Sequence, residues 1–142
     1  MRTIGRDISI LSRQFNIYIA KELQAIDIMT SEYIFVINIE KGIKTNQKEL
    51  CDIFALNKAA ATRAISSLMR KGYVNRERNP DNKREYLLSL TKEGEKIKPV
   101  ILEKLTKWTE LLTADLSDEQ TEEVADILAQ FRKNACKENT HE

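Results

Sequence analysis

The chain has 142 residues, 42% of them hydrophobic, and this size and composition suit one domain with its own core. Its two cysteines, Cys51 and Cys136, lie far apart without CxxC or histidine spacing, which argues against a disulfide framework and against a zinc site. No apolar run approaches the roughly 18 residues of a transmembrane helix, so we expect a cytoplasmic protein that does not contact the membrane.

The net charge of +1 conceals a separation of charge along the chain. Residues 44–84 contain ten basic and four acidic side chains, whereas residues 110–142 contain nine acidic and three basic ones. A basic module within a neutral protein is an electrostatic footprint for phosphate. A basic face that only keeps the protein in solution is the alternative reading of the charge alone.

Residues 4–26 predict one amphipathic helix, because apolar side chains recur there at spacings of three and four. The stripe consists of Ile8, Leu11, Phe15, Tyr18 or Ile19, Leu23 and Ile26. Residues 33–39 have the composition of a strand, yet Thr30 and Ser31 precede them as possible helix caps. We predict a short buried helix, because the segment directly precedes a helix-turn-helix pattern.

Two short helices with about three residues between them are predicted over residues 47–54 and 58–71. Thr45 or Asn46 is the expected cap of the first helix, Asn57 caps the second, and Gly72 ends it. The expected inward-facing residues are Leu50, Ile53 and Phe54, followed by Ala61, Ile65, Leu68 and Met69. This spacing is typical of a helix-turn-helix, whose second helix enters the major groove of DNA.

The outer face of the second helix carries small or hydrogen-bonding side chains, and no bulky apolar residue blocks its approach to DNA. These side chains are Lys58, Ala59, Thr62, Arg63, Ser66 and Arg70. Arg63 can bind guanine through both arms of its guanidinium group, and Thr62 can bond a base or contact a thymine methyl group. Arg70, near the helix end, is better placed for phosphate. A surface salt bridge is the alternative role for Arg63.

Residues 73–78 and 85–90 predict two strands around a turn at residues 79–84. This hairpin has a cationic tip, and its candidate DNA contacts are Arg76, Arg78, Lys83 and Arg84. Arginines on such a hairpin can reach the narrow minor groove beside a helix in the major groove. An edge hairpin kept soluble by its charges is the alternative.

Two helices with apolar stripes are predicted in the C-terminal third. The first begins at Thr91, contains Pro99, which is expected to bend it, and carries a stripe formed by Ile97, Ile101, Leu105, Trp108 and Leu112. The second begins with a capping box at residues 117–120 and presents Val124, Ile127, Leu128 and Phe131. These stripes exceed what one small domain needs, so pairing with a second copy would bury the remainder. An intramolecular helical core is the alternative.

Several motifs occur together in one order along the chain. They are Met29-Thr30-Ser31-Glu32-Tyr33, Gln47-Lys48-Glu49-Leu50, Leu56-Asn57-Lys58, Thr62-Arg63, Leu68-Met69-Arg70-Lys71-Gly72-Tyr73-Val74-Asn75-Arg76, Asn79-Pro80-Asp81-Asn82-Lys83-Arg84 and Leu90-Thr91-Lys92-Glu93-Gly94. With these motifs the chain resembles the MarR (multiple antibiotic resistance regulator) family of winged helix-turn-helix transcription factors. The resemblance spans nearly the whole chain.

This resemblance implies a mainly α fold with a small β-hairpin wing, built as one domain over residues 1–142. Residues 30–94 would form the DNA-binding region, and residues 1–28 and 95–142 the dimerisation helices. It also implies a homodimer that binds double-stranded DNA at a pseudo-palindromic operator and is commonly released by a small aromatic or anionic effector. Two-fold pairing would place the recognition helices about 34 Å apart, as successive major grooves require.

In the MarR family an Asp-x-Arg pair lies in the wing, where the arginine enters the minor groove and the aspartate orients it. By resemblance this pair falls on Asn82 and Arg84. Because asparagine stands at the aspartate position, either Asn82 or the neighbouring Asp81 is expected to orient Arg84.

An effector pocket is expected where the dimerisation helices meet the winged region, and its candidate residues are Arg13, Phe15, Tyr18, Tyr33 and Trp108. Phe35 could also line such a pocket. Aromatic residues at helical spacing are more often part of a core, and Arg13 is otherwise a solvated charge. Cys51 is interpreted as a small buried residue and Cys136 as an exposed thiol, with a redox role as the alternative.

The sequence therefore predicts a sequence-specific transcriptional regulator, and repression is favoured over activation as its mode of action. An architectural DNA-binding protein without sequence preference and a winged-helix module that binds protein are the alternatives. No motif supplies the nucleophile, base and orienting group of an enzyme, and no cofactor or metal ion is expected.

Overall fold

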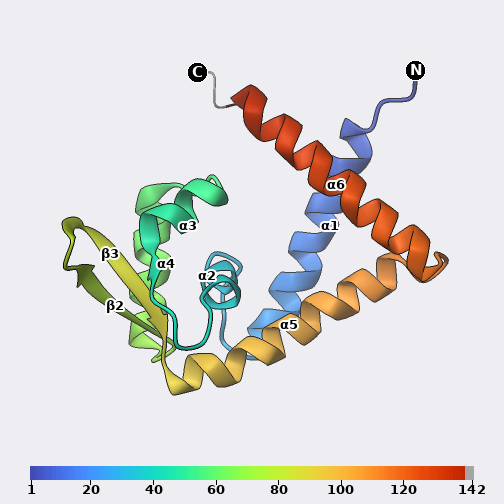
Figure 1. Cartoon of the computed structure of the whole chain (residues 1–142). Coiled ribbons are helices and arrows are strands. Elements are labelled where there is room, and N and C mark those ends of the chain that lie inside the picture. Colours follow the sequence, from blue (N-terminus) through green and yellow to red (C-terminus); the bar gives the residue numbers. More distant parts are fainter. Residues whose placement is uncertain (140–142) are drawn as a thin grey trace. The chain divides into compact units, whose positions relative to one another are not determined.

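The computed structural model describes residues 1–139, and its chain forms two compact units, residues 1–106 and residues 107–142. The helices are α1 (Gly5–Gln24), α2 (Tyr33–Asn38), α3 (Gln47–Ile53), α4 (Lys58–Arg70), α5 (Lys92–Leu112) and α6 (Asp118–Asn139). The strands are β1 (Thr45–Asn46), β2 (Val74–Asn79) and β3 (Asn82–Leu90) (Figure 1). The expected class, mainly α with a small β wing, is confirmed.

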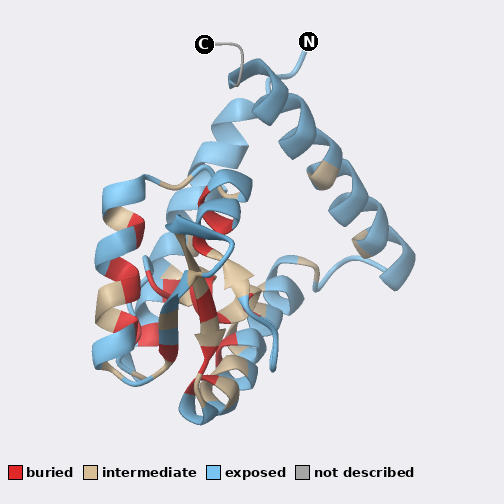
Figure 2. Ribbon diagram, turned by 60° about the vertical axis from the view of Figure 1, so that its left-hand side comes forward, coloured by how far each residue is buried: buried red, intermediate tan, exposed pale blue. Residues whose placement is uncertain are grey.

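The core lies in the unit of residues 1–106, where helices meet one face of the sheet (Figure 2). Its fully buried apolar side chains come from α1, α2, α4, β3 and α5, and from the segment after α2: Ile19, Leu23, Phe35, Val36, Ile39, Ile65, Leu68, Leu88 and Ile101. Burying such side chains in contact with one another is the main stabilising contribution to a domain of this size. The core thereby fixes α4 against the sheet that carries the wing.

Helix α1 occupies most of the predicted range 4–26, and α2 confirms the predicted short buried helix. The predicted caps of α2 are wrong. Neither Thr30 nor Ser31 caps it; the N-cap position is Glu32, without a side-chain cap bond of its own. Instead the Glu32 carboxylate turns back and accepts a hydrogen bond from the backbone N–H of Met29 at 2.8 Å. The Glu32 side chain thus bonds a backbone N–H three residues earlier and does not cap α2.

The capping predictions for α3 and α4 are confirmed. The side chain of Asn46 accepts a hydrogen bond from the Glu49 N–H, and that of Asn57 accepts one from the Ala60 N–H. Gly72 follows α4 with φ +82°, a conformation that favours glycine. The N–H groups of Gly72 and Tyr73 donate to the carbonyls of Met69 and Leu68, which closes the helix end.

Two of the predicted inward-facing residues are wrong. Ile53 is 69% exposed and Met69 is 37% exposed. The buried face of α3 instead contains Gln47, Leu50 and Cys51, and that of α4 contains Ala61, Ala64, Ile65 and Leu68. Both buried stripes follow spacings of three and four, and Ile53 and Met69 lie next to the buried faces of their helices.

The sheet differs from the predicted two-stranded hairpin in two ways. A third strand, β1, pairs antiparallel with β3, and the strand order is β1-β3-β2. The turn is also shorter than residues 79–84, because β2 runs to Asn79 and β3 begins at Asn82. Lys83 and Arg84 therefore belong to β3 and do not lie in the turn. A strand of two residues has too little pattern to be recognised from sequence.

Helix α5 begins at Lys92, directly after the predicted Thr91, whose hydroxyl accepts from the Gly94 N–H and donates to the Gly72 carbonyl. Gly94 is required there by space, because a Cβ atom would overlap the Tyr73 carbonyl oxygen. The capping box before α6 is also confirmed: Ser117 and Gln120 each accept from the backbone N–H of the other.

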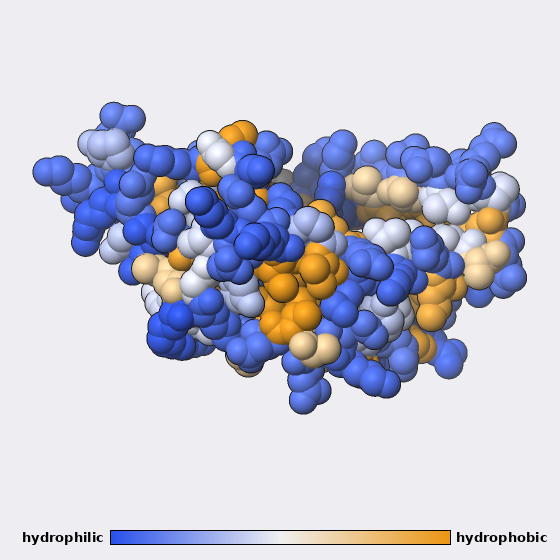
Figure 3. Space-filling view, turned by 90° about the horizontal axis from the view of Figure 1, so that it is seen from below, coloured by the Kyte–Doolittle hydropathy of each residue, from blue (hydrophilic) through white to orange (hydrophobic). Residues whose placement is uncertain are grey.

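Apolar side chains remain exposed on both terminal helices. Those of α1 include Ile8, Ile10, Leu11 and Ile17, and those of α6 are Val124, Ile127, Leu128 and Phe131. In Figure 3, apolar side chains gather in a patch bordered by hydrophilic ones. Over residues 1–139, no helix combines the length and the apolar character that spanning a membrane requires.

Candidate nucleic-acid interface

The exposed face of α4 carries the side chains predicted to contact DNA. Lys58, Thr62, Arg63 and Arg70 are exposed, and Ser66 is half-buried. Thr62 donates its hydroxyl hydrogen to the Lys58 carbonyl at 3.0 Å, which leaves its oxygen lone pairs and its methyl group for an incoming surface. Among the described residues, Arg63 makes no ion pair or hydrogen bond, so the salt bridge considered for it does not form.

A groove of about 300 Å³ lies between α3, the first turns of α4 and β3. Its lining residues are Gln47, Lys48, Cys51, Asp52, Leu56, Lys58, Thr62, Arg84, Glu85 and Tyr86. Three cationic side chains border the groove against two acidic ones, so its net charge is positive beside the exposed face of α4. The structure therefore brings Lys58 and Thr62 of the predicted second helix and Arg84 of the predicted wing around one depression.

The wing arginines on β2 lie against an aromatic ring. The guanidinium carbons of Arg76 and Arg78 are 4.4 Å and 5.2 Å from the ring centroid of Tyr86. Arg78 stands directly opposite Tyr86 in the antiparallel register, and Arg76 lies on the same face two residues earlier. Cation–π contacts of this kind orient both guanidinium groups. Tyr86 was not predicted as a site residue, because alternation alone gives no reason to pair it with two cations.

Asn82, and not Asp81, contacts Arg84. The Asn82 side-chain oxygen accepts a hydrogen bond from the Arg84 backbone N–H at 3.1 Å. The backbone N–H of Asp81 itself donates to the Asn79 side chain at 3.0 Å. The asparagine at the expected aspartate position thus acts on the main chain at Arg84.

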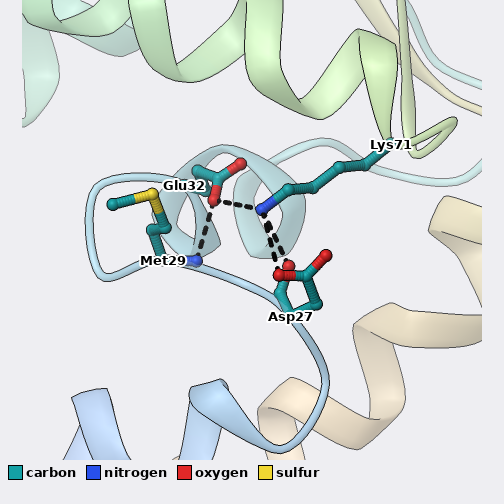
Figure 4. A network of polar contacts seen from close by, with 4 residues as sticks. All are labelled: Asp27, Met29, Glu32 and Lys71. Carbon is teal, nitrogen blue, oxygen red and sulfur yellow. Dashed lines mark hydrogen bonds and ion pairs between the residues drawn. The ribbon is translucent and has the colours of Figure 1, made fainter.

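A buried ion pair joins the end of α4 to the loop between α1 and α2 (Figure 4). The Lys71 Nζ atom lies 2.9 Å from Oε1 of Glu32, whose side chain is 1% exposed, and donates to the Asp27 carbonyl at 2.8 Å. Glu32 Oε2 is buried without a donor among the described residues. Asp27 adopts φ +54°, an uncommon conformation for a residue with a side chain. This network could not be predicted locally, because 39 residues separate Glu32 from Lys71.

The predicted effector residues occupy different environments. Phe15, Tyr18 and Tyr33 pack against the core, and the Tyr18 hydroxyl donates to the Lys104 carbonyl at 3.0 Å. Burial raises the pKa of the Tyr33 phenol above its ordinary value. Arg13 is exposed and donates to the Ser9 hydroxyl, and Trp108 is half-buried in the unit of residues 107–142. Their role in effector binding stays a prediction.

The two cysteines match their predicted exposure. Cys51 is buried, and burial together with the neighbouring Asp52 charge raises the pKa of its thiol. Cys136 is exposed. A raised pKa suppresses the reactive thiolate, which disfavours Cys51 as an oxidant sensor. Over residues 1–139, no three side chains of the His, Cys, Asp or Glu type come together as a metal site requires.

Comparison with known proteins agrees with this geometry. A protein-family model described as MarR family matches residues 31–86 of this chain. These residues include the helix-turn-helix and most of the wing. A MarR transcriptional regulator from Methanosarcina mazei Go1 is 33% identical, with a TM-score of 0.85 over 94% of this chain and 96% of that one. The chain belongs to the MarR family.

Two further relatives are informative for this MarR-family protein. The HTH-type transcriptional regulator BilQ of Clostridioides difficile is 28% identical over 114 residues, which is 80% of this chain and 77% of BilQ. A MarR family regulator from Listeria monocytogenes, crystallised with a 26mer DNA, shares the fold with a TM-score of 0.90 at 22% identity, over 97% of this chain and 92% of that one. These relatives are named as regulators, and this MarR-family protein is a transcriptional regulator and not an enzyme.

Proposed function

We propose that this MarR-family protein is a homodimeric repressor that binds a pseudo-palindromic DNA operator and is released by a small aromatic or anionic effector. One observation carries the DNA-binding part of the proposal. The exposed face of α4 presents Lys58, Arg63 and Arg70, and none of them is paired with an acidic residue among those described. Unpaired cations on one helix face attract phosphate and leave a guanidinium group available for a base edge.

The arrangement of α4 and the wing fits the grooves of duplex DNA. The first turns of α4 are accessible for the major groove, and Arg84 on β3 lies beside the same groove of the protein as Lys58 and Thr62. A helix in the major groove with an arginine in the neighbouring minor groove reads both base edges and groove width. The Listeria relative, which was crystallised with DNA, has the same fold. DNA therefore fits this surface better than a protein partner does.

The homodimer part of the proposal is supported by exposed apolar surface. Leu128 on α6 is 53% exposed, and Leu11 on α1 is 47% exposed. Apolar side chains repeated along a helix face are normally covered in the functional assembly. A second copy is the simplest cover, because a two-fold dimer also supplies the second recognition helix that an inverted repeat requires.

The proposed release by an effector would operate through linkage. A ligand that binds better to a dimer whose recognition helices do not match the operator spacing lowers the affinity of the protein for DNA. DNA lowers the affinity of the protein for that ligand by the same factor. Within the unit of residues 1–106, Arg13, Phe15, Tyr18 and Tyr33 are the proposed contacts for such a ligand.

Selection of bound fragments from the source genome with the purified full-length chain tests the proposal. At about 150 mM salt, binding through phosphate alone is suppressed. The proposal expects a few fragments that share an inverted repeat with half-sites about 10 bp apart. Fragments without a shared motif would indicate an architectural protein, and no fragments at all would indicate a protein-binding module; either result overturns the proposal.

A further inference from the structure

The peptide unit between Lys83 and Arg84 is held by side chains on both of its polar groups. Its N–H donates to the Asn82 side-chain oxygen at 3.1 Å. Its carbonyl oxygen, which belongs to Lys83, accepts a hydrogen bond from Nη1 of Arg78 at 2.7 Å. Because a peptide unit is planar, two bonds at opposite edges fix the orientation of the plane. The direction of the Arg84 side chain then depends only on torsions beyond that plane.

This support replaces backbone pairing that the strand lacks. Arg78 pairs with Tyr86 and Asn79 pairs with Asn82, so residues 83–85 of β3 have no register partners on β2. An irregularity of this kind leaves backbone groups without their ladder bonds and bends the strand. Without other bonds, the segment that carries Arg84 would sample several conformations.

Arg78 is itself held in place by Tyr86. Its guanidinium carbon lies 5.2 Å from the centroid of the Tyr86 ring, across the hairpin. On the far side of Arg84, the Glu85 carboxylate accepts a hydrogen bond from the side-chain amide of Asn46 at 2.7 Å. Asn46 also caps α3, so the chain is anchored to the helix-turn-helix directly after Arg84.

We propose that Arg78 and Tyr86 are positioning residues that hold Arg84 for the minor groove, and that Arg78 does not contact DNA itself. The inference rests on the proposed DNA-binding function and assigns a different task to a residue whose charge alone suggests a phosphate contact. Arg78 uses one nitrogen for the Lys83 carbonyl, and its guanidinium carbon lies over the Tyr86 ring. Through the main chain, Arg78 orients Arg84, which is the task that the resemblance gives to an aspartate in the wing.

A double-mutant cycle tests this assignment. The probes are two duplexes with the inverted repeat that the wild-type chain selects from random DNA, one with A/T flanks and one with G/C flanks. Dissociation constants are measured for wild type, Arg78→Ala, Arg84→Ala and the double variant. Loss of a charged hydrogen bond predicts that Arg78→Ala weakens binding to the A/T-flanked duplex about tenfold. The G/C-flanked duplex should be bound nearly as well as by wild type, which also shows that the variant is folded.

The decisive expectation is non-additivity. If Arg78 acts through Arg84, the double variant binds no more weakly than Arg84→Ala alone. The inference is overturned if the losses of affinity of the two single variants multiply in the double variant, or if Arg78→Ala loses equal affinity for both duplexes. Either result would show that Arg78 contacts phosphate directly. Lys83→Ala is the matched control, because it removes a charge from the same segment but keeps the carbonyl that Arg78 binds. The loss of DNA affinity in Lys83→Ala should be the same on both duplexes. It should multiply with the loss caused by Arg84→Ala.

Conservative variants separate positioning from charge. Tyr86→Phe keeps the ring and should bind like wild type, whereas Tyr86→Leu should behave like Arg78→Ala. Arg78→Lys keeps the charge but loses the planar fork, so it should also lose the A/T preference. Retention of that preference by Arg78→Lys would overturn the inference. A wild-type chain that selects no shared motif would instead overturn the proposed function, which keeps the two failures distinct.

Discussion

At the scale of single residues, Arg63 and Arg70 carry the same charge but occupy different parts of α4. Arg63 lies in the second turn after the Asn57 cap, where a recognition helix meets base edges, and Arg70 is the last residue of the helix. Arg63→Ala should cost about 1 to 3 kcal/mol and relax the preference at one base position per half-site, while Arg70→Ala should weaken all sequences alike. Competition binding with operator and random duplexes measures both effects. Equal losses of Arg63→Ala on the two duplexes would contradict the base-reading role.

The Lys71–Glu32 pair predicts a large change in the free energy of unfolding. Removing the cation by Lys71→Met leaves a buried carboxylate without its partner, which should cost about 3 kcal/mol. Replacing both residues, as in Lys71→Met with Glu32→Leu, should recover most of that loss. Urea unfolding at one fixed protein concentration gives both values. A Lys71→Met variant as stable as wild type would refute a structural role for the pair.

Residue-level features were predictable where their cause is local. Asn46, Asn57 and Ser117 cap helices that begin beside them, so a short window of sequence contains the whole signal. Glu32 and Lys71 meet across 39 residues, and nothing near either one predicts the contact. The Arg78 bond to the Lys83 carbonyl spans only five residues, yet it depends on a strand irregularity that composition does not reveal.

At the scale of elements, the helices and the hairpin of β2 and β3 were predicted, whereas the third strand was not. A periodicity of 3.6 residues over ten or more positions defines a long helix such as α1, whereas α3 has seven residues, which was too short to place Ile53 on the correct face. Strand β1 exists because Thr45 and Asn46 lie beside β3 in the folded chain. Tertiary contact, and not local propensity, creates that strand.

The junction between β3 and α5 gives a prediction for one glycine. In Gly94→Ala, the added methyl group would overlap the Tyr73 carbonyl, whose position is fixed because it accepts the Thr91 N–H at 3.1 Å. The variant should therefore lose about 2 kcal/mol or more of stability. Gly5→Ala is the control, because nothing lies within 4 Å of the place that its added methyl group would occupy, and alanine favours a helix. Thermal unfolding compares the two, and equal midpoints would contradict the steric argument.

At the scale of the whole molecule, recognition of an inverted repeat depends on an assembly of two chains. Leu128 and Phe131 lie exposed on α6 at helical spacing, with Lys133 away from that stripe. Leu128→Glu should place a charge in the interface of the proposed dimer and shift the chain toward monomer. Lys133→Glu introduces the same side chain outside the stripe and should leave the dimer intact. Sedimentation velocity distinguishes these results, and an unchanged dimer in Leu128→Glu would exclude α6 from the interface.

The class of transcriptional regulator was predictable because a locally basic stretch coincides with the helix-turn-helix pattern. Residues 44–84 hold ten of the 23 basic side chains in a chain whose net charge is only +1. The structure places several of these charges on the exposed face of α4 and on the wing, and this pattern is typical of nucleic-acid binding. Effector chemistry was less predictable, because aromatic residues such as Phe15 and Tyr33 serve a core and a pocket equally well.

The ratio of two dissociation constants tests the central claim most directly. The purified chain is titrated at about 150 mM salt with a duplex that carries the selected inverted repeat and with a scrambled duplex of the same composition. A sequence-specific regulator should bind the inverted repeat about 10³-fold more tightly or better, with one dimer per duplex. A ratio near one would contradict sequence-specific regulation, because a basic surface that attracts only phosphate binds both duplexes equally.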